Sequence, residues 1–269
     1  MSPHRLIPGH KVRIADLPTR ADDFHSDRDE AKDELLELRD ELIALQPKLY
    51  AEGQRKLLIV FQAMDAGGKD GVVRKVFRGV NAQGVRVNSF KTPSSEELAH
   101  DFLWRIHRVV PARGMIGIFN RSHYEEVLVV RVENLVPKSV WHDRYEQINQ
   151  FEKFLIETGT TVLKFFLHIS PEEQRQRMQE RLDDPEKHWK FSLDDLDKRR
   201  KWHDYMAAYE ELLNRCTTEQ APWYAIPGDQ NWYRDLAVAR VIVATLRKMN
   251  PQFPPEEFDA ADVVIPDIT

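Results

Sequence analysis

The 269-residue sequence contains a single cysteine, Cys216. A disulfide within the chain and a cysteine-based zinc site are therefore excluded, and nothing indicates an oxidising compartment. Long apolar runs are also missing: the longest, residues 57–61 and 127–130, fall far short of the roughly 20 residues that span a membrane. The N-terminus lacks the continuous apolar stretch of a signal peptide. We therefore expect a cytoplasmic protein without a membrane partner.

A net positive charge is absent as well. The chain carries 39 basic and 44 acidic residues, a formal charge of −5, which argues against a protein that coats nucleic acid. A chain of this length with 42% hydrophobic residues can bury a sizeable core. We expect a single domain over residues 1–269, in which residues 1–54 form an N-terminal helical extension.

Five short apolar runs indicate the fold class. Runs without polar alternation are typical of strands buried on both faces of a parallel sheet. Helical patterns separate them, and N-cap signals at Ser94 and Ser170 predict helices that begin near residues 95 and 171. The alternation predicts an α/β fold in which helices cover both faces of a five-stranded parallel sheet. The runs are residues 56–62, 85–90, 115–119, 162–169 and 223–226.

A stripe of leucines precedes the first run. Its members recur at alternating steps of three and four, which predicts a helix over about residues 31–50. Two interpretations are open: the favoured one is a helix that covers the core, and the other is a helix at a subunit interface. The second interpretation would make the protein a homo-oligomer. The stripe consists of Leu35, Leu38, Leu42, Leu45 and Leu49.

The segment QAMDAGGKDG, residues 62–71, lies between the first run and an apolar-periodic helix. A phosphate-binding loop needs small residues that expose backbone N–H groups, a helix N-terminus and a lysine. The usual pattern G-x-x-x-x-G-K-[ST] has Ala63 and Asp70 at two fixed positions here. The alternative is a glycine turn that binds nothing. We expect phosphate contacts from Ala66, Gly67, Gly68, Lys69 and Asp70.

Asp65 is the candidate metal ligand of this loop. Asp70 replaces the hydroxyl that ligates magnesium in the usual pattern, so another oxygen ligand is required. A carboxylate beside bound phosphates would be repelled unless a divalent cation bridged them. Asp65 therefore predicts a metal-dependent site.

A second polar segment follows the run at residues 115–119. Asn120 stands where an acidic residue ordinarily ends this strand, and Arg121, Glu125 and Glu126 come next. Since ligands collect at the carboxyl ends of parallel strands, this segment should face the phosphate loop. Arg121 can neutralise a transferring phosphoryl group, although a surface ion pair with either glutamate is the alternative. We expect the metal ligands to be Asp65 with help from Glu125 or Glu126, and take Asp65 and Glu126 as the set.

Positive charge is concentrated between residues 55 and 131, which hold thirteen Lys and Arg against seven Asp and Glu. This segregation favours a channel for a long polyanion, with a solvated basic face as the alternative. Residues 175–205 are the candidate lid, a basic loop followed by a long helix. In it, Arg181 is the preferred catalytic residue. Arg177 shares its helix face, so we expect both to reach one phosphate chain. Further phosphate contacts are expected from Arg74, Lys75, Lys187 and Arg200.

Across residues 30 to 250, the chain resembles the polyphosphate kinase 2 family. The resemblance rests on QAMDAGGKDG, on LWRIHRVVPARGMIGIFNRSHYEEVLVVRV and on DDPEKHWKFSLDDLDKRRKWHDYMAAYEELL, in this order. It implies a P-loop kinase fold like that of thymidylate kinases. It further implies reversible transfer of phosphate between inorganic polyphosphate and nucleotides with Mg²⁺, or Mn²⁺, as the cofactor.

The resemblance also assigns roles. Asp65 matches the loop aspartate that engages metal and nucleotide phosphate, and Lys69 matches the essential lysine. Arg121 and Arg181 match the catalytic arginines. The form Asn-Arg-Ser-x-Tyr-Glu is similar to the branch that phosphorylates both mono- and diphosphates, which favours AMP to ADP to ATP, with GMP and GDP as further acceptors. Two rivals stay open: an ATP-dependent nucleoside monophosphate kinase, and a non-catalytic polyphosphate-binding protein. The expected nucleotide contacts are Asp65, Lys91, Arg105, Asn120, Arg121 and Glu125.

Overall fold

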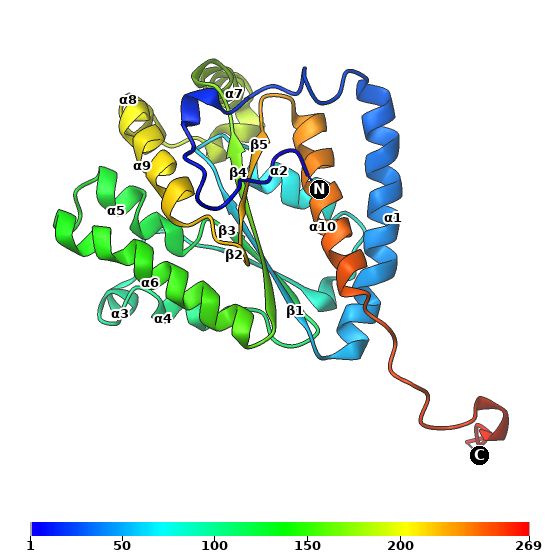
Figure 1. Ribbon diagram of the computed structural model, residues 1–269. Coiled ribbons are helices and arrows are strands. Elements are labelled where there is room, and N and C mark those ends of the chain that lie inside the picture. Colours follow the sequence, from blue (N-terminus) through cyan, green and yellow to red (C-terminus); the bar gives the residue numbers. More distant parts are fainter. Residues whose placement is uncertain (1, 269) are drawn as a thin grey trace.

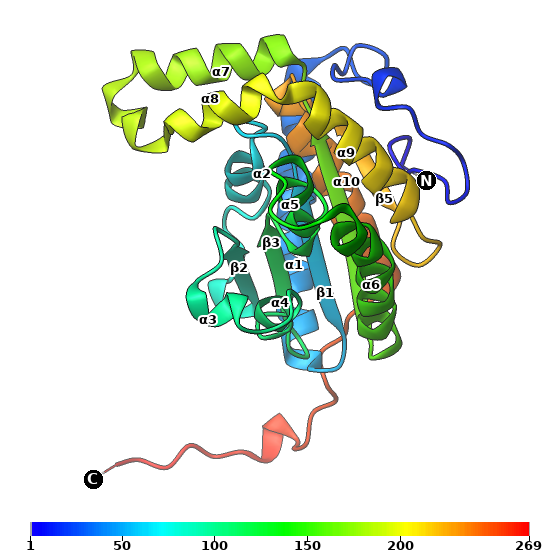
Figure 2. The same cartoon turned by 90° about the vertical axis from the view of Figure 1, so that its left-hand side faces the viewer.

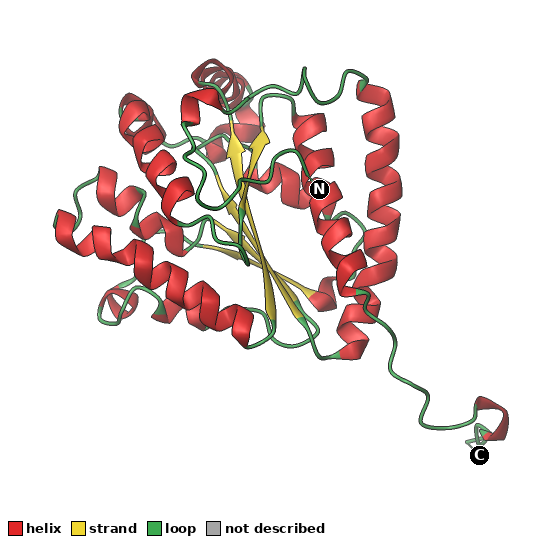
Figure 3. Ribbon diagram, in the orientation of Figure 1, coloured by secondary structure: helices red, strands yellow, loops and turns green. Residues whose placement is uncertain are grey.

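A computed structural model describes residues 2–268. Its centre is a parallel sheet of five strands in the order β2-β3-β1-β4-β5 (Figure 3). Each expected apolar run forms one strand, which confirms the predicted sheet and the α/β fold class. The strands are β1 (Lys56–Gln62), β2 (Val85–Ser89), β3 (Ile116–Asn120), β4 (Thr160–His168) and β5 (Trp223–Pro227).

The strand order places a switch point beside β1. β3 pairs with one edge of β1 and β4 with the other, so the connections leave the sheet in opposite directions. Ligand sites of open α/β sheets form at such a point, outside the carboxyl ends of the strands. The register sets Phe61 opposite Asn120, so that the segments following β1 and β3 start side by side.

Helices cover both faces of the sheet (Figure 1). Residues alternate along β1, so Leu57 and Ile59 join one apolar cluster while Leu58 and Val60 join the other. The first cluster includes α1 (Arg28–Glu52), α2 (Lys69–Val76) and α10 (Asn231–Met249). The second includes α6 (Lys138–Glu157) and α9 (Trp202–Arg215). Shorter helices lie at α3 (Ser95–Leu98), α4 (Trp104–His107) and α5 (Val129–Val132).

The leucine stripe of α1 faces inward. Leu35, Leu38, Leu42 and Leu49 are buried, and α1 packs against α10 in the first cluster. The interpretation as a helix that covers the core is therefore confirmed. The stripe gives no support to a homo-oligomer, because its apolar face is already covered within the chain.

Ser94 and Ser170 cap α3 and α7 (Pro171–Asp183) as predicted. After a 3₁₀ helix at Pro185–Lys190, α8 (Leu193–Arg200) runs alongside α7, and the pair forms an arm beyond the sheet (Figure 2). The long helix expected after the basic loop is divided in two at Lys201. This break lets α8 follow α7 while α9 packs into the core.

The C-terminal segment after Asn250 extends away from the domain (Figure 1). Within residues 2–268, none of the helices combines the length and apolar character needed to cross a bilayer.

Candidate active site

The loop after β1 is a tight turn held in a special backbone conformation. Gly68, the N-cap of α2, has φ of 91°, and Ala66 also has a positive φ, 62°. A Cβ on Gly68 would lie 2.0 Å from Nη1 of Arg234, and one on Gly67 would lie 2.5 Å from the Ala63 Cβ. Both positions therefore require glycine. Because a non-glycine residue at positive φ is strained, Ala66 marks a loop whose shape the surroundings impose.

Lys69 begins α2 and folds back across this loop. Its buried Nζ donates to the carbonyl oxygens of Ala63, at 2.8 Å, and Met64, at 3.3 Å. Burial and the nearby charge of Arg121 lower the pKa of Lys69 to about 8, against the opposing effect of Asp65 and other carboxylates. The ammonium is thus held at the loop and is close to its titration range near neutral pH.

Two arginines brace the loop from outside. Arg177 of α7 donates to the Ala66 carbonyl at 3.1 Å and to the Gly228 carbonyl at 2.6 Å. Arg234 of α10 is 2% exposed and donates to Asp235. From the sequence we expect Arg177 to contact a phosphate chain, whereas its guanidinium lies on backbone carbonyls in the structure. Arg234 belongs to no motif, so the sequence does not indicate its place beside the loop.

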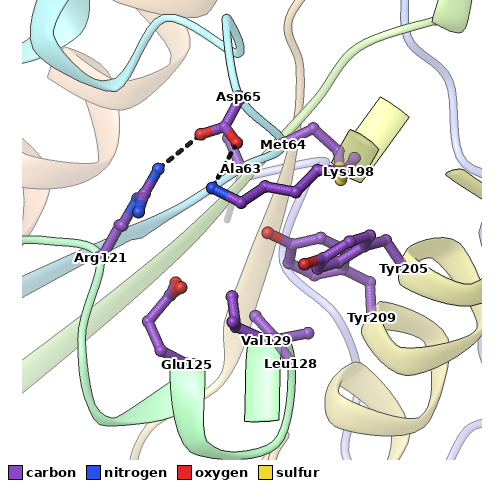
Figure 4. Close-up of a pocket in the computed structure, with 10 residues that line it drawn as sticks. All are labelled: Ala63, Met64, Asp65, Arg121, Glu125, Leu128, Val129, Lys198, Tyr205 and Tyr209. Carbon is purple, nitrogen blue, oxygen red and sulfur yellow. Dashed lines mark hydrogen bonds and ion pairs between the residues drawn. The ribbon is translucent and has the colours of Figure 1, made fainter. Parts of the chain in front are cut away.

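Asp65 is the meeting point of the loop, the β3 segment and the arm (Figure 4). Arg121 Nη2 lies 2.5 Å from Asp65 Oδ1, and Lys198 Nζ of α8 lies 3.4 Å from Oδ2. Glu125 and Tyr209 line the same pocket. The structure thus brings together Asp65, Arg121 and Glu125 as expected. Lys198 was missed because a basic run does not reveal which of its members faces inward.

The charges in this pocket stabilise one another. Burial raises the pKa of Asp65, but Arg121, Lys69 and Lys198 outweigh it, so the net shift is downward. Burial opposes the charge of Arg121, yet Glu125 and Asp65 raise its pKa overall. Asp65 is therefore a carboxylate and Arg121 a cation throughout the neutral range.

Arg121 is also strained: its φ is 61°. Its backbone N–H donates to the Phe61 carbonyl at 3.1 Å, which extends the β1–β3 pairing by one residue. Strain of about 1 to 3 kcal/mol at such a residue persists only where the surrounding structure imposes it. The side chain is thereby directed towards Asp65.

Asp70, which departs from the usual phosphate-loop pattern, contacts Asn120, which stands where an acidic residue ordinarily ends this strand. Nδ2 of Asn120 lies 2.5 Å from Oδ1 of Asp70 and donates to it. Where the usual pattern combines a hydroxyl with a carboxylate, this chain combines a carboxylate with an amide. The pair keeps a hydrogen bond between the end of β3 and the start of α2. Neither residue lines the pocket around Asp65.

Glu126 does not join Asp65, which corrects the predicted metal set. It is buried, its Oε2 lies 2.5 Å from Arg144, and its Oε1 lies 3.9 Å from Arg105. Burial raises the pKa of Glu126 despite these arginines. The neighbouring Glu125 is the carboxylate that lines the pocket, because a 3₁₀ turn directs consecutive side chains to different sides.

The other expected contacts lie outside the pocket. Arg105 is buried and donates to the Lys91 carbonyl at 2.9 Å. Arg181 lies 3.6 Å from Asp195, whose pKa is raised by burial and by the nearby charge of Asp65. The remaining basic residues are exposed: Arg74 and Lys75 on α2, Lys187 paired with Asp184, and Arg200 paired with Asp197.

The donor set fits a magnesium site that relies on its substrate. Within residues 2–268, no cluster of three or more His, Cys, Asp or Glu could enclose an ion. Mg²⁺ in phosphotransferases is commonly held by one or two carboxylates, waters and substrate phosphates rather than by an all-protein cage. Asp65 and Glu125, which line one pocket beside the phosphate loop, match that requirement.

Comparison with known proteins places the chain in a family. The family model described as "Polyphosphate kinase 2 (PPK2)" matches residues 25–254. The AMP/ADP-polyphosphate phosphotransferase of Meiothermus ruber is 52% identical over 98% of this chain and 100% of its own length. The ADP-polyphosphate phosphotransferase of Rhodopseudomonas palustris is 46% identical over 93% of this chain and 91% of its own.

Solved structures agree with this assignment. The crystal structure of polyphosphate kinase 2 from Arthrobacter aurescens TC1 has a TM-score of 0.91 and 40% identity, and the match covers 96% of this chain and 92% of that one. The residues that the family model matches, 25–254, include the sheet, the phosphate loop and the arm. The fold is that of a P-loop kinase, and the chain belongs to the polyphosphate kinase 2 family.

Proposed function

We propose that this protein transfers phosphate from inorganic polyphosphate to AMP and ADP, reversibly, with GMP and GDP as further acceptors. The observation that carries the proposal is the convergence of Asp65, Arg121, Glu125 and Lys198 next to a lysine-containing phosphate loop. A relative named AMP/ADP-polyphosphate phosphotransferase, aligned over its full length, supports the choice of acceptors.

The residues act by position and charge rather than through a covalent intermediate. The backbone N–H groups at the start of α2 and the ammonium of Lys69 hold one phosphate group. Arg121, fixed by its backbone pairing with β1, neutralises charge on the phosphoryl group in transfer. Arg181, which lies on α7 in the arm, supplies a second positive charge when the arm closes.

Mg²⁺, or Mn²⁺ in its place, would be held by Asp65 and Glu125 together with substrate phosphate oxygens. When bound, the ion would supply positive charge that offsets the repulsion between the phosphates of donor and acceptor. Glu125 takes the place that the sequence analysis gave to Glu126, since the latter is engaged by two arginines. Arg121, Lys69 and Lys198 hold the pKa of Asp65 below its usual value, so this carboxylate is ionised at neutral pH and available to a cation.

The arm formed by α7 and α8 is the proposed lid. Lys198 extends from α8 to Asp65, so the base of the arm already contributes to the pocket. Arg181 and the exposed basic residues Lys187 and Arg200 continue the positive charge outward, along a path suited to a long polyanion. We propose that the whole chain is a single domain and that the protein acts in the cytoplasm.

The donor assay tests this function. Protein and Mg²⁺ are incubated with polyphosphate and either AMP or ADP, with no ATP present, and nucleotide products are separated by chromatography. ADP from AMP and ATP from ADP are expected. Products that appear only when ATP is supplied would instead identify a nucleoside monophosphate kinase, and salt-sensitive polyphosphate binding without turnover would identify a binding protein.

A further inference from the structure

The loop after β3 has one side that lines the pocket and another that is buried in the protein. Arg121 and Glu125 line the pocket, whereas the residues between them point into the protein: Ser122, His123 and Tyr124 are 0% exposed. Whatever fixes the inner side of this short loop therefore also fixes where the two pocket residues lie. The inner side rests on a buried ion pair that the phosphate chemistry described above does not use.

Lys164 of β4 and Glu152 of α6 form that pair. The lysine is 0% exposed and the glutamate 2% exposed, and Nζ lies 2.6 Å from Oε2. The same Nζ donates to the Tyr124 hydroxyl at 3.0 Å and to the Cys216 carbonyl at 2.7 Å. All three ammonium protons thus have an acceptor, and one of these acceptors belongs to the loop.

Glu152 holds the loop with its second oxygen. Oε1 accepts a hydrogen bond from the Tyr124 hydroxyl at 2.7 Å and lies 3.2 Å from Nε2 of His123. Nδ1 of His123 is buried and has no hydrogen-bond partner, so Glu152 provides the contact that orients the imidazole. Two consecutive residues between Arg121 and Glu125 are therefore fixed by the same carboxylate.

A buried ion pair is a poor source of stability. Removing two charges from water offsets most of their attraction, and apolar residues of similar volume commonly stabilise a core as well or better. What the pair provides is a fixed geometry, since both oxygens of Glu152 and all three protons of Lys164 have specific partners. A purely structural role would not require these directional contacts to converge on the loop that presents Arg121 and Glu125.

We propose that Glu152 and Lys164 are positioning residues for phosphate transfer, which they support by holding Tyr124 and His123 so that Arg121 and Glu125 lie at the phosphate loop. The inference rests on the proposed function, in which Arg121 stabilises the transferring group. Displacement of a catalytic group by about 1 Å can cost roughly 100-fold in rate. Loosening the inner side of the loop should therefore lower kcat more than it weakens binding of AMP.

Tyr124→Phe is the first test, because it removes one hydroxyl and leaves the ring. Tyr145→Phe is the matched control: Tyr145 is also buried, and its hydroxyl accepts from Arg131 at 3.1 Å, away from the loop. The melting temperature should fall by a similar amount in both variants. Only Tyr124→Phe should lower kcat, by about tenfold, with KM for AMP nearly unchanged.

A double-mutant cycle identifies the route of the effect. If Tyr124 acts through Arg121, then Tyr124→Phe should cause no further loss of kcat in an Arg121→Ala background. Glu152→Gln, which keeps the shape of the side chain, should behave like Tyr124→Phe; if it fails to fold, the cycle with Tyr124 alone decides. Independent losses in the cycle, or equal kcat in the two tyrosine variants, would overturn the positioning role while wild-type transfer remains. A wild-type protein that transfers nothing from polyphosphate would overturn the proposed function and this inference with it.

Discussion

Replacing Gly68 by alanine should damage both the stability of the protein and its phosphate loop. The backbone there has φ of 91°, which costs an alanine about 1 kcal/mol. The new Cβ would also lie 2.0 Å from Arg234 Nη1, and this guanidinium is 2% exposed and bonded to Asp235 and Asn231. Displacing it disturbs charge-assisted hydrogen bonds worth about 2 kcal/mol. The expected loss is therefore about 3 kcal/mol in the free energy of unfolding.

Gly159→Ala separates the two contributions. Gly159 follows α6 with nearly the same φ, 88°, and a Cβ there would meet nothing within 4 Å. Its loss should be only the backbone cost of about 1 kcal/mol, measured by urea unfolding of both variants. Gly68→Ala should also reduce phosphate transfer at least tenfold because Lys69 follows directly, while Gly159→Ala should leave it unchanged. Equal losses of stability at the two glycines would refute the assigned contact with Arg234.

Three further outcomes are expected. The pKa of Lys69 is about 8, so its protonated, phosphate-binding form is present below this pH and is lost above it. Therefore kcat/KM should fall as pH rises through 8. Lys69→Arg should move that decline to higher pH. Lys198→Ala should raise KM for polyphosphate about tenfold, as one cation of a partly buried site is worth roughly 1.4 kcal/mol. Lys153→Ala, at an exposed pair with Glu157 on α6, should change it little in the same assay. Asn120→Asp should lower the melting temperature by setting a second carboxylate against Asp70, and the double variant Asn120→Asp with Asp70→Ser should restore it.

The sheet and the phosphate loop could be predicted because their signals are local. An apolar run such as residues 56–62 has one favourable environment, and glycines between a strand and a lysine-headed helix allow few backbone shapes. The strand order then brings Arg121 to Asp65, since parallel strands end at the same edge. These inferences required only the chain direction and the rules of α/β folds.

The remaining contacts depend on tertiary packing. Glu125 and Glu126 are adjacent and chemically alike, yet one lines the pocket while the other meets two arginines from other helices. Lys198 reaches Asp65 from α8, which a break at Lys201 separates from α9. Arg234 lies 166 positions after Gly68 in the chain and has no motif of its own. No local pattern could have revealed these three placements.

The proposed role of Lys69 in phosphate transfer can be measured as the rate of ADP formation from AMP and polyphosphate, without ATP and under saturating Mg²⁺. The wild type and Lys69→Ala are compared. We expect Lys69→Ala to lose about 100-fold or more of this rate, with a circular dichroism spectrum like that of the wild type. A folded Lys69→Ala protein that forms ADP at nearly the wild-type rate would contradict this role of Lys69.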